Sequence, residues 1–103
     1  MMFDRKYVGP SLYRIASVLD SGLDDAEIHS IETQIAEMTV SDKVKDLGTF
    51  PVVYDGKETE IRIEAKLLME GEDKEVILHL FSDPELVQIL DEELMAFADE
   101  LGI

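Results

Sequence analysis

The stretch from Thr49 to Met69 most constrains the fold, because its apolar residues are spaced as in strands rather than helices. The run "TFPVVY" is followed by Asp55-Gly56 and then by "KETEIRIEAKLLM". Asp-Gly is a favoured type I′ turn pair, so the stretch predicts a β-hairpin. Pro51 has no N–H to donate to a neighbouring strand, which predicts that the first strand lies at a sheet edge.

The second strand of this hairpin has one apolar and one charged face. Such alternation predicts that one face is buried and that the other contacts water. The charges alternate in sign, which indicates weak cross-strand ion pairs on a solvated face rather than a binding site. The apolar positions are Ile61, Ile63, Ala65 and Leu67, and the charged positions are Glu60, Arg62, Glu64 and Lys66.

A third strand is predicted in "KEVILHLF" (residues 74–81), after a turn at "EGED" (residues 70–73). Apolar side chains point to both of its faces, so we expect a central strand or one that is covered on its second side. The stretch "VSDKVKDLG" (residues 40–48) fits either a helical turn or an irregular lead-in to the sheet.

The first of two helices before the sheet is predicted in residues 9–22. Pro10 suits the first helical position, where its missing N–H costs nothing. Gly22 is suited to a left-handed helix stop. Helical spacing then gives one apolar stripe, made of Leu12, Ile15, Ala16 and Leu19.

The second helix has the clearest start signal in the chain. Asp24 is the expected N-cap and Glu27 its partner in a capping box, while Leu23 and Ile28 have the spacing of a hydrophobic staple. The predicted apolar stripe is narrow and consists of Ile28, Ile31, Ile35 and Met38.

A last helix is predicted from residue 82 to the C-terminus. Ser82 and Asp83 are both candidate N-caps, and Ser82 and Glu85 have the spacing of a capping box. Pro84 lies in the first turn, and Gly102 is expected to end the helix. The apolar stripe consists of Val87, Leu90, Leu94, Phe97 and Leu101, widened by Leu86, Met95 and Ala98. These elements predict one α+β domain over residues 1–103. In it, two N-terminal helices precede a three-stranded antiparallel meander, and a C-terminal helix packs on the sheet (ααβββα).

The charge is unusual for a domain of this size. The chain has 24 acidic and 9 basic residues, for a net charge of −15. A field of this sign disfavours direct binding to nucleic acids or anionic membranes and attracts basic proteins. Improved solubility is a competing explanation for the same charge. There is no cysteine, no apolar run long enough to span a bilayer and no pattern of a signal peptide, so we expect a cytoplasmic protein.

The sequence contains no recognisable catalytic motif, and we expect no enzyme, cofactor site or metal site. Nucleophile and phosphate-loop patterns are missing. His29 and Glu32 have helical i, i+3 spacing, but a di-metal bundle needs such a pair on at least two helices. His79 with Asp83 is the best acid–base candidate that remains.

The candidate partner-binding residues are the carboxylates of the last helix and of the turn before the third strand. Residues 75–103 contain no Lys or Arg. Anions near a helix C-terminus oppose the macrodipole and repel each other, at about 1 to 2 kcal/mol in total. A partner could use this surface, or Arg5, Lys6 or Arg14 could fold back onto it. The candidates are Asp91, Glu92, Glu93, Asp99 and Glu100 in the helix, and Glu70, Glu72 and Asp73 in the turn.

These observations favour a non-enzymatic acidic interaction protein that binds a basic surface of a partner protein. A narrower form of the hypothesis is an inhibitor of a nucleic-acid-acting protein, such as a DNA mimic, an anti-defence or immunity protein, or an antitoxin. One alternative is a structural or homo-oligomeric subunit, for instance a homodimer through the edge strand with Leu68 and Met69 at the interface. The other is a small ligand-binding or enzyme domain that uses His79.

Overall fold

The computed structural model describes residues 2–39, 43–70 and 73–102. The elements, in chain order, are β1 (Met2–Asp4), the 3-10 helix η1 (Arg5–Tyr7), α1 (Val8–Ser17), α2 (Asp25–Ala36), β2 (Val44–Tyr54), β3 (Lys57–Glu70), β4 (Asp73–Phe81) and α3 (Pro84–Leu101). The predicted ααβββα order is confirmed. The short strand β1 precedes it and was not predicted, because three residues carry no readable alternation.

The strands form one antiparallel sheet with the order β1-β4-β3-β2. The predicted meander is therefore β2-β3-β4, and β4 is a central strand, as its two-sided apolar pattern suggested. The ambiguous stretch at residues 40–48 is a strand from Val44 onward, with a bulge between Asp46 and Gly48. Residues 40–42 lie outside the described part of the chain.

The β2–β3 hairpin forms as predicted. Asp55 and Gly56 both have positive φ, at 50° and 74°, as a type I′ turn requires. The Asp20 carboxylate accepts a hydrogen bond from the Gly56 N–H at 2.9 Å, which ties the turn to the α1–α2 linker. Strand β2 lies at the sheet edge, which agrees with the position of Pro51.

Helix α1 differs from its prediction at both ends. It begins at Val8, so Pro10 is the third helical residue rather than the first, and it ends at Ser17. Gly22 therefore does not stop the helix. It lies in the linker with φ 109°, where the chain passes close to β2 and Ser21 forms a bridge to Val53.

Helix α2 has the predicted capping box. The Asp24 carboxylate accepts from the Glu27 N–H at 2.8 Å, and the Glu27 carboxylate accepts from the Asp24 N–H at 3.3 Å. At the other end of the helix, the Arg5 guanidinium donates to the carbonyl oxygens of Ile35 and Met38 at 2.8 and 3.3 Å. A cation at this position satisfies carbonyls that a helix end leaves free.

Helix α3 starts at Pro84 and ends at Gly102, which has the expected left-handed conformation. The predicted Ser82–Glu85 capping box is wrong. The Ser82 hydroxyl instead donates to the Glu60 carbonyl at 2.6 Å, and the Asp83 carboxylate accepts from the Thr59 hydroxyl at 2.9 Å. These side chains hold the start of α3 on β3 instead of capping the helix.

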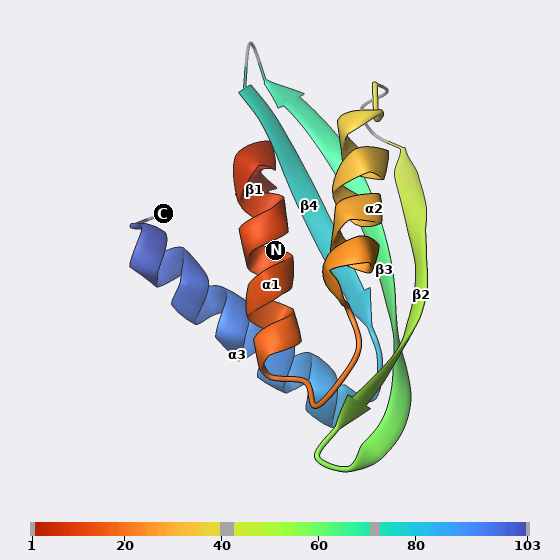
Figure 1. The fold of residues 1–103 in the computed structure, drawn as a ribbon. Helices are drawn as coiled ribbons and strands as arrows, with labels where there is room; N and C mark the ends of the chain where they lie inside the picture. The colour runs from red at the N-terminus through yellow and green to blue at the C-terminus, as the bar shows by residue number, and fades with distance from the viewer. Residues whose placement is uncertain (1, 40–42, 71–72, 103) are drawn as a thin grey trace.

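The core lies between the helices and one face of the sheet. Helices α1 and α2 lie side by side over this inner face, and α3 runs against α1 (Figure 1). Met95, which we expected to widen the apolar stripe of α3, is 59% exposed. No helix in the described residues is long and apolar enough to cross a membrane. The buried hydrophobic residues form one cluster that draws on all three α-helices and strands β2, β3 and β4: Val8, Leu12, Ile15, Leu23, Ile28, Ile31, Ile35, Leu47, Val52, Ile61, Ile63, Ala65, Leu67, Val76, Leu78, Leu86, Leu90 and Leu94.

Candidate partner-binding surface

The exposed carboxylates Asp91, Glu92 and Asp99 lie on the side of α3 opposite its core contacts, whereas Glu93 and Glu100 lie on the flank that faces α1. Leu86, Leu90 and Leu94 are buried at three- and four-residue spacing, which fixes the rotation of the helix about its axis. Asp91 and Glu92 immediately follow Leu90 and are exposed. The amphipathic pattern therefore places Asp91 and Glu92 outward, while Glu93, next to the buried Leu94, is half-buried.

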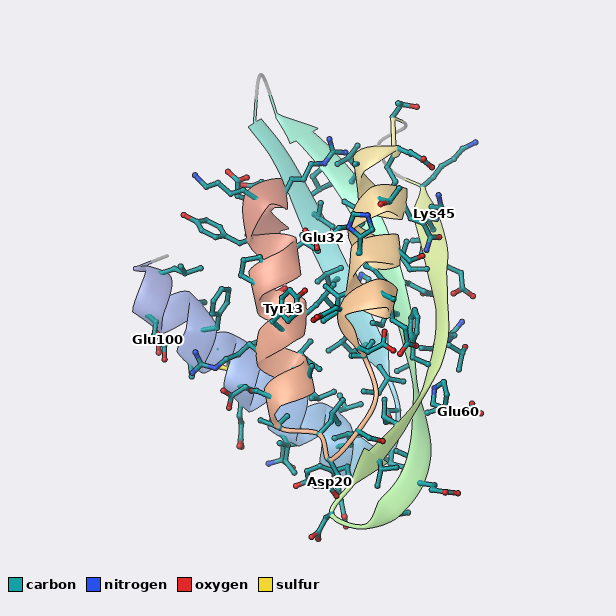
Figure 2. All side chains as sticks on the ribbon, in the orientation of Figure 1. Tyr13, Asp20, Glu32, Lys45, Glu60 and Glu100 are labelled. Carbon is teal, nitrogen blue, oxygen red and sulfur yellow. The ribbon has the colours of Figure 1, made fainter. Side chains whose placement is uncertain are left out.

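Arg14 of α1 neutralises part of this surface. Its Nε donates to Glu93, and its two terminal nitrogens donate to the two carboxylate oxygens of Glu100 at 2.6 and 2.8 Å. Figure 2 shows Glu100 towards the C-terminal end of α3. Of the three N-terminal cations that could have folded back, Arg14 does so, whereas Arg5 binds the end of α2 and Lys6 stacks on the Tyr7 ring at 5.1 Å.

The bidentate contact changes the acid–base properties of both groups. Hydrogen bonds from Arg14 lower the pKa of Glu100 below its ordinary value, because they stabilise the ionised carboxylate. The same hydrogen bonds, from Glu100 first and Glu93 second, raise the pKa of Arg14. Two of the five candidate carboxylates on α3 are thus engaged within the molecule.

Three candidate carboxylates remain on α3 without a salt bridge in the described structure, namely Asp91, Glu92 and Asp99. All three are exposed. Met95 lies four residues after Asp91, three after Glu92 and four before Asp99, which are the spacings of helix neighbours. The result is an exposed methionine with carboxylates on both sides along the helix. We call these four residues the α3 surface.

The turn candidates are separated from this surface in the fold. Glu70 ends β3 and Asp73 begins β4, and their backbones pair across the hairpin. Glu72 lies outside the described residues, and the side chains of Glu70 and Asp73 are also outside the description. Helix α3 starts beyond the other end of β4, so the structure does not bring the turn to the start of the helix.

The two histidines lie on different surfaces. His29 is exposed on α2 and lines a hollow of about 320 Å³ with Glu32 and Arg5. His79 is exposed on β4 opposite Glu64, whereas Asp83 is bonded to Thr59. Among the described residues, no three acidic or histidine side chains converge closely enough to hold a metal ion.

Replacing Arg14 by methionine will raise the pKa of Glu100 toward its ordinary value of 4.5. Because the folded-state pKa is depressed, the Arg14 contact stabilises the fold above pH 4.5 and loses this contribution as the pH falls through the folded pKa. The wild-type protein should therefore lose more stability than Arg14→Met between about pH 6 and about pH 3. Titration of the Glu100 carboxyl carbon by NMR measures the shift directly.

Lys57→Met is the matched control, because Lys57 lies 3.6 Å from Asp83 on another part of the surface. It removes one cation of the same charge and should leave the Glu100 titration unchanged. Equal Glu100 pKa values in the wild-type protein and Arg14→Met would contradict the proposed contact.

Comparison with known proteins gives no family assignment. No family model, curated protein or solved structure matches this chain. What the protein does must therefore be inferred from its own residues.

Proposed function

We propose that the protein is a non-enzymatic binding protein whose α3 surface docks on a basic surface of another protein. The observation that carries this proposal is the set Asp91, Glu92 and Asp99, which stay exposed and without salt bridges while Arg14 engages their neighbours. Unneutralised carboxylates on one face steer a basic partner toward that face and raise its association rate.

Met95 supplies the apolar contact that such a surface needs. Charged pairs at the rim of an interface contribute little affinity, whereas a central apolar side chain in a partner pocket contributes much of it. Methionine is unbranched and polarisable, so it adapts to pockets of different shape. The expected partner surface is accordingly an apolar pocket with Lys or Arg residues on both sides.

The spacing of the charges supports this broad proposal better than mimicry of duplex DNA. Asp91 and Asp99 are eight residues apart, which is roughly 12 Å along a helix. Three carboxylates in this length are sparse beside duplex DNA, which carries a charge about every 1.7 Å of its axis. Inhibition of a nucleic-acid-acting protein stays a narrower form of the proposal, in which the α3 surface covers only part of the basic site.

The test is affinity capture of partners at low salt, followed by affinity measurement with the purified partner. We expect Asp91→Lys/Glu92→Lys to weaken binding at least about 100-fold, since each reversal replaces an attraction by a repulsion. Met95→Ser should weaken it by about tenfold or more, without a change in charge. The affinity of the wild-type protein should fall steeply as the salt concentration rises.

The matched control is Glu37→Lys/Glu58→Lys, which changes the net charge by the same amount at exposed positions, one directly after α2 and one on β3. It should retain nearly all of the affinity. If both double variants lose the same affinity, binding follows net charge alone, and the proposal for the α3 surface is wrong.

A further inference from the structure

The face of the sheet that points away from α1 and α2 is open to solvent. We call it the outer face. Its central strand is β3, whose outward side chains are Glu60, Arg62, Glu64 and Lys66, while the intervening residues are buried beneath the helices. Glu60 and Glu100 lie on opposite sides of the molecule (Figure 2), so the outer face is separate from the C-terminal end of α3. At its Phe81 corner the outer face adjoins α3, because Phe81 and Asp91 line the same hollow.

Apolar and aromatic groups accompany these charges. Phe81 of β4 lies opposite Arg62, and the guanidinium of Arg62 is 4.3 Å from the centre of the Phe81 ring. Val44 of β2 lies opposite Lys66. Val44 and Phe81 are 56% and 42% exposed. Arg62 covers one side of the Phe81 ring within the chain, and an interface on this face would bury the rest of Phe81 together with Val44.

The charges on β3 are self-complementary. Along the strand they run negative, positive, negative, positive, and Ile63 lies at the midpoint. Within the chain, Arg62 already donates to Glu64 at 3.0 Å. A two-fold axis over Ile63, in the plane between two stacked sheets and perpendicular to the strands, places Glu60 against Lys66 of a second copy. It also brings the Arg62–Glu64 pair against the same pair of that copy, with opposite charges facing each other. Stacking with the strands parallel would instead place each charge against its own kind. The pattern therefore selects the antiparallel arrangement.

The same axis also gives compatible side-chain contacts on the neighbouring strands β4 and β2. On β4, Leu80 pairs with Ile63, so Phe81 faces His79 of the second copy. On β2, Val44 and Pro51 pair with Lys66 and Glu60, so Val44 faces Pro51 of the second copy. Each exposed apolar or aromatic group thus meets an apolar or aromatic partner. The hollow of about 460 Å³ beside Phe81 has room for the imidazole of His79.

We propose that the outer face is the interface of a homodimer, in which two copies stack their sheets antiparallel about Ile63. This inference does not depend on the proposed function, because it concerns the protein without a partner.

The expected dimer is weak. Three strands of about nine residues cover roughly 14 by 30 Å. The contact area of each protomer is therefore smaller than in a standard stable interface, and we expect a dissociation constant in the micromolar range. The excess negative charge of each copy also opposes association, and a Debye length of about 8 Å at 0.15 M salt screens that repulsion.

Sedimentation equilibrium at about 0.15 M salt, with dilutions over roughly two decades around micromolar concentrations, tests the proposal. We expect the mass to rise from 11.6 kDa toward twice that value. Arg62→Glu and Glu64→Arg, made singly, should each weaken the dimer at least about tenfold, because each creates like-charged contacts across the axis. The double variant Arg62→Glu/Glu64→Arg keeps opposite charges face to face and should restore the dimer to within about threefold.

Glu92→Arg is the control, because it reverses one charge on α3 and leaves the outer face unchanged. A mass of 11.6 kDa at every concentration would overturn the proposal. So would a dimer that the single reversals do not weaken, or a double variant as weak as the singles. Amide NMR shifts provide a readout without substitutions: those of residues 61–66 and 78–81 should move with concentration, and a response confined to α3 would contradict the inference.

Discussion

Replacing Gly22 by alanine will lower the free energy of unfolding by about 3 kcal/mol or more. Gly22 has φ 109°, which side-chain-bearing residues rarely adopt, and strain of this kind costs about 1 to 3 kcal/mol. A Cβ atom at this position would also lie 2.6 Å from the Val52 Cγ1 and 2.8 Å from the Pro51 carbonyl oxygen. Relief of that overlap costs about a further 1 to 3 kcal/mol. Urea unfolding followed by circular dichroism measures the loss.

Gly56→Ala separates the two causes. Gly56 also has positive φ, at 74°, but no atom lies within 4 Å of a Cβ placed there. Its loss of stability should therefore be only about 1 to 2 kcal/mol, from the backbone alone. Equal losses of stability in the two alanine variants would contradict this explanation. They would show that the close contact between Gly22 and β2 does not contribute to the effect of Gly22→Ala.

Replacing Leu12 by alanine will destabilise the protein by about 3 kcal/mol, within the range of 2 to 5 kcal/mol that buried leucines show. Leu12 is fully buried in α1, the helix that contacts both α2 and α3. Truncation leaves a cavity in the core, and the high helix propensity of alanine offsets only a small part of the loss. Thermal and urea unfolding should report the same change.

Tyr13→Ala is the control for this position. Tyr13 is the next residue on the same helix and is 48% exposed, so its truncation should cost less than half as much. Leu12→Met keeps most of the volume and should cost less than about 1.5 kcal/mol. A loss in Tyr13→Ala as large as that in Leu12→Ala would show that α1 does not anchor the core as described.

Features that depend on neighbouring residues could be predicted from the sequence. The Asp55-Gly56 turn and the capping box of Asp24 and Glu27 form as expected, because each involves residues at most three positions apart. The alternation on β3 also predicted its buried face correctly, since the side-chain direction in a strand depends only on position. The outward position of Asp91 and Glu92 on α3 follows in the same way from helical spacing.

Predictions from local sequence patterns were wrong where a residue contacts a segment that is distant in the chain. Ser82 was one of two expected N-caps of α3, but its hydroxyl donates to the Glu60 carbonyl, and Asp83 occupies the N-cap position. Gly22 was expected to end α1, but it lies in the linker, where the absence of a side chain lets the backbone pass close to Val52. In both examples a contact between elements far apart in the chain determined the role, and no local spacing contains that information.

The sequence by itself determined the α+β class, the order of the elements, the hairpin and the acidic outer side of α3, because periodicity and turn chemistry act over a few residues. Only the tertiary structure decided which carboxylates are neutralised. Arg14 reaches Glu93 and Glu100 because α1 packs against α3, although 79 and 86 positions separate the partners. Packing likewise left Met95 in solvent, since the helix turns its buried leucines toward α1.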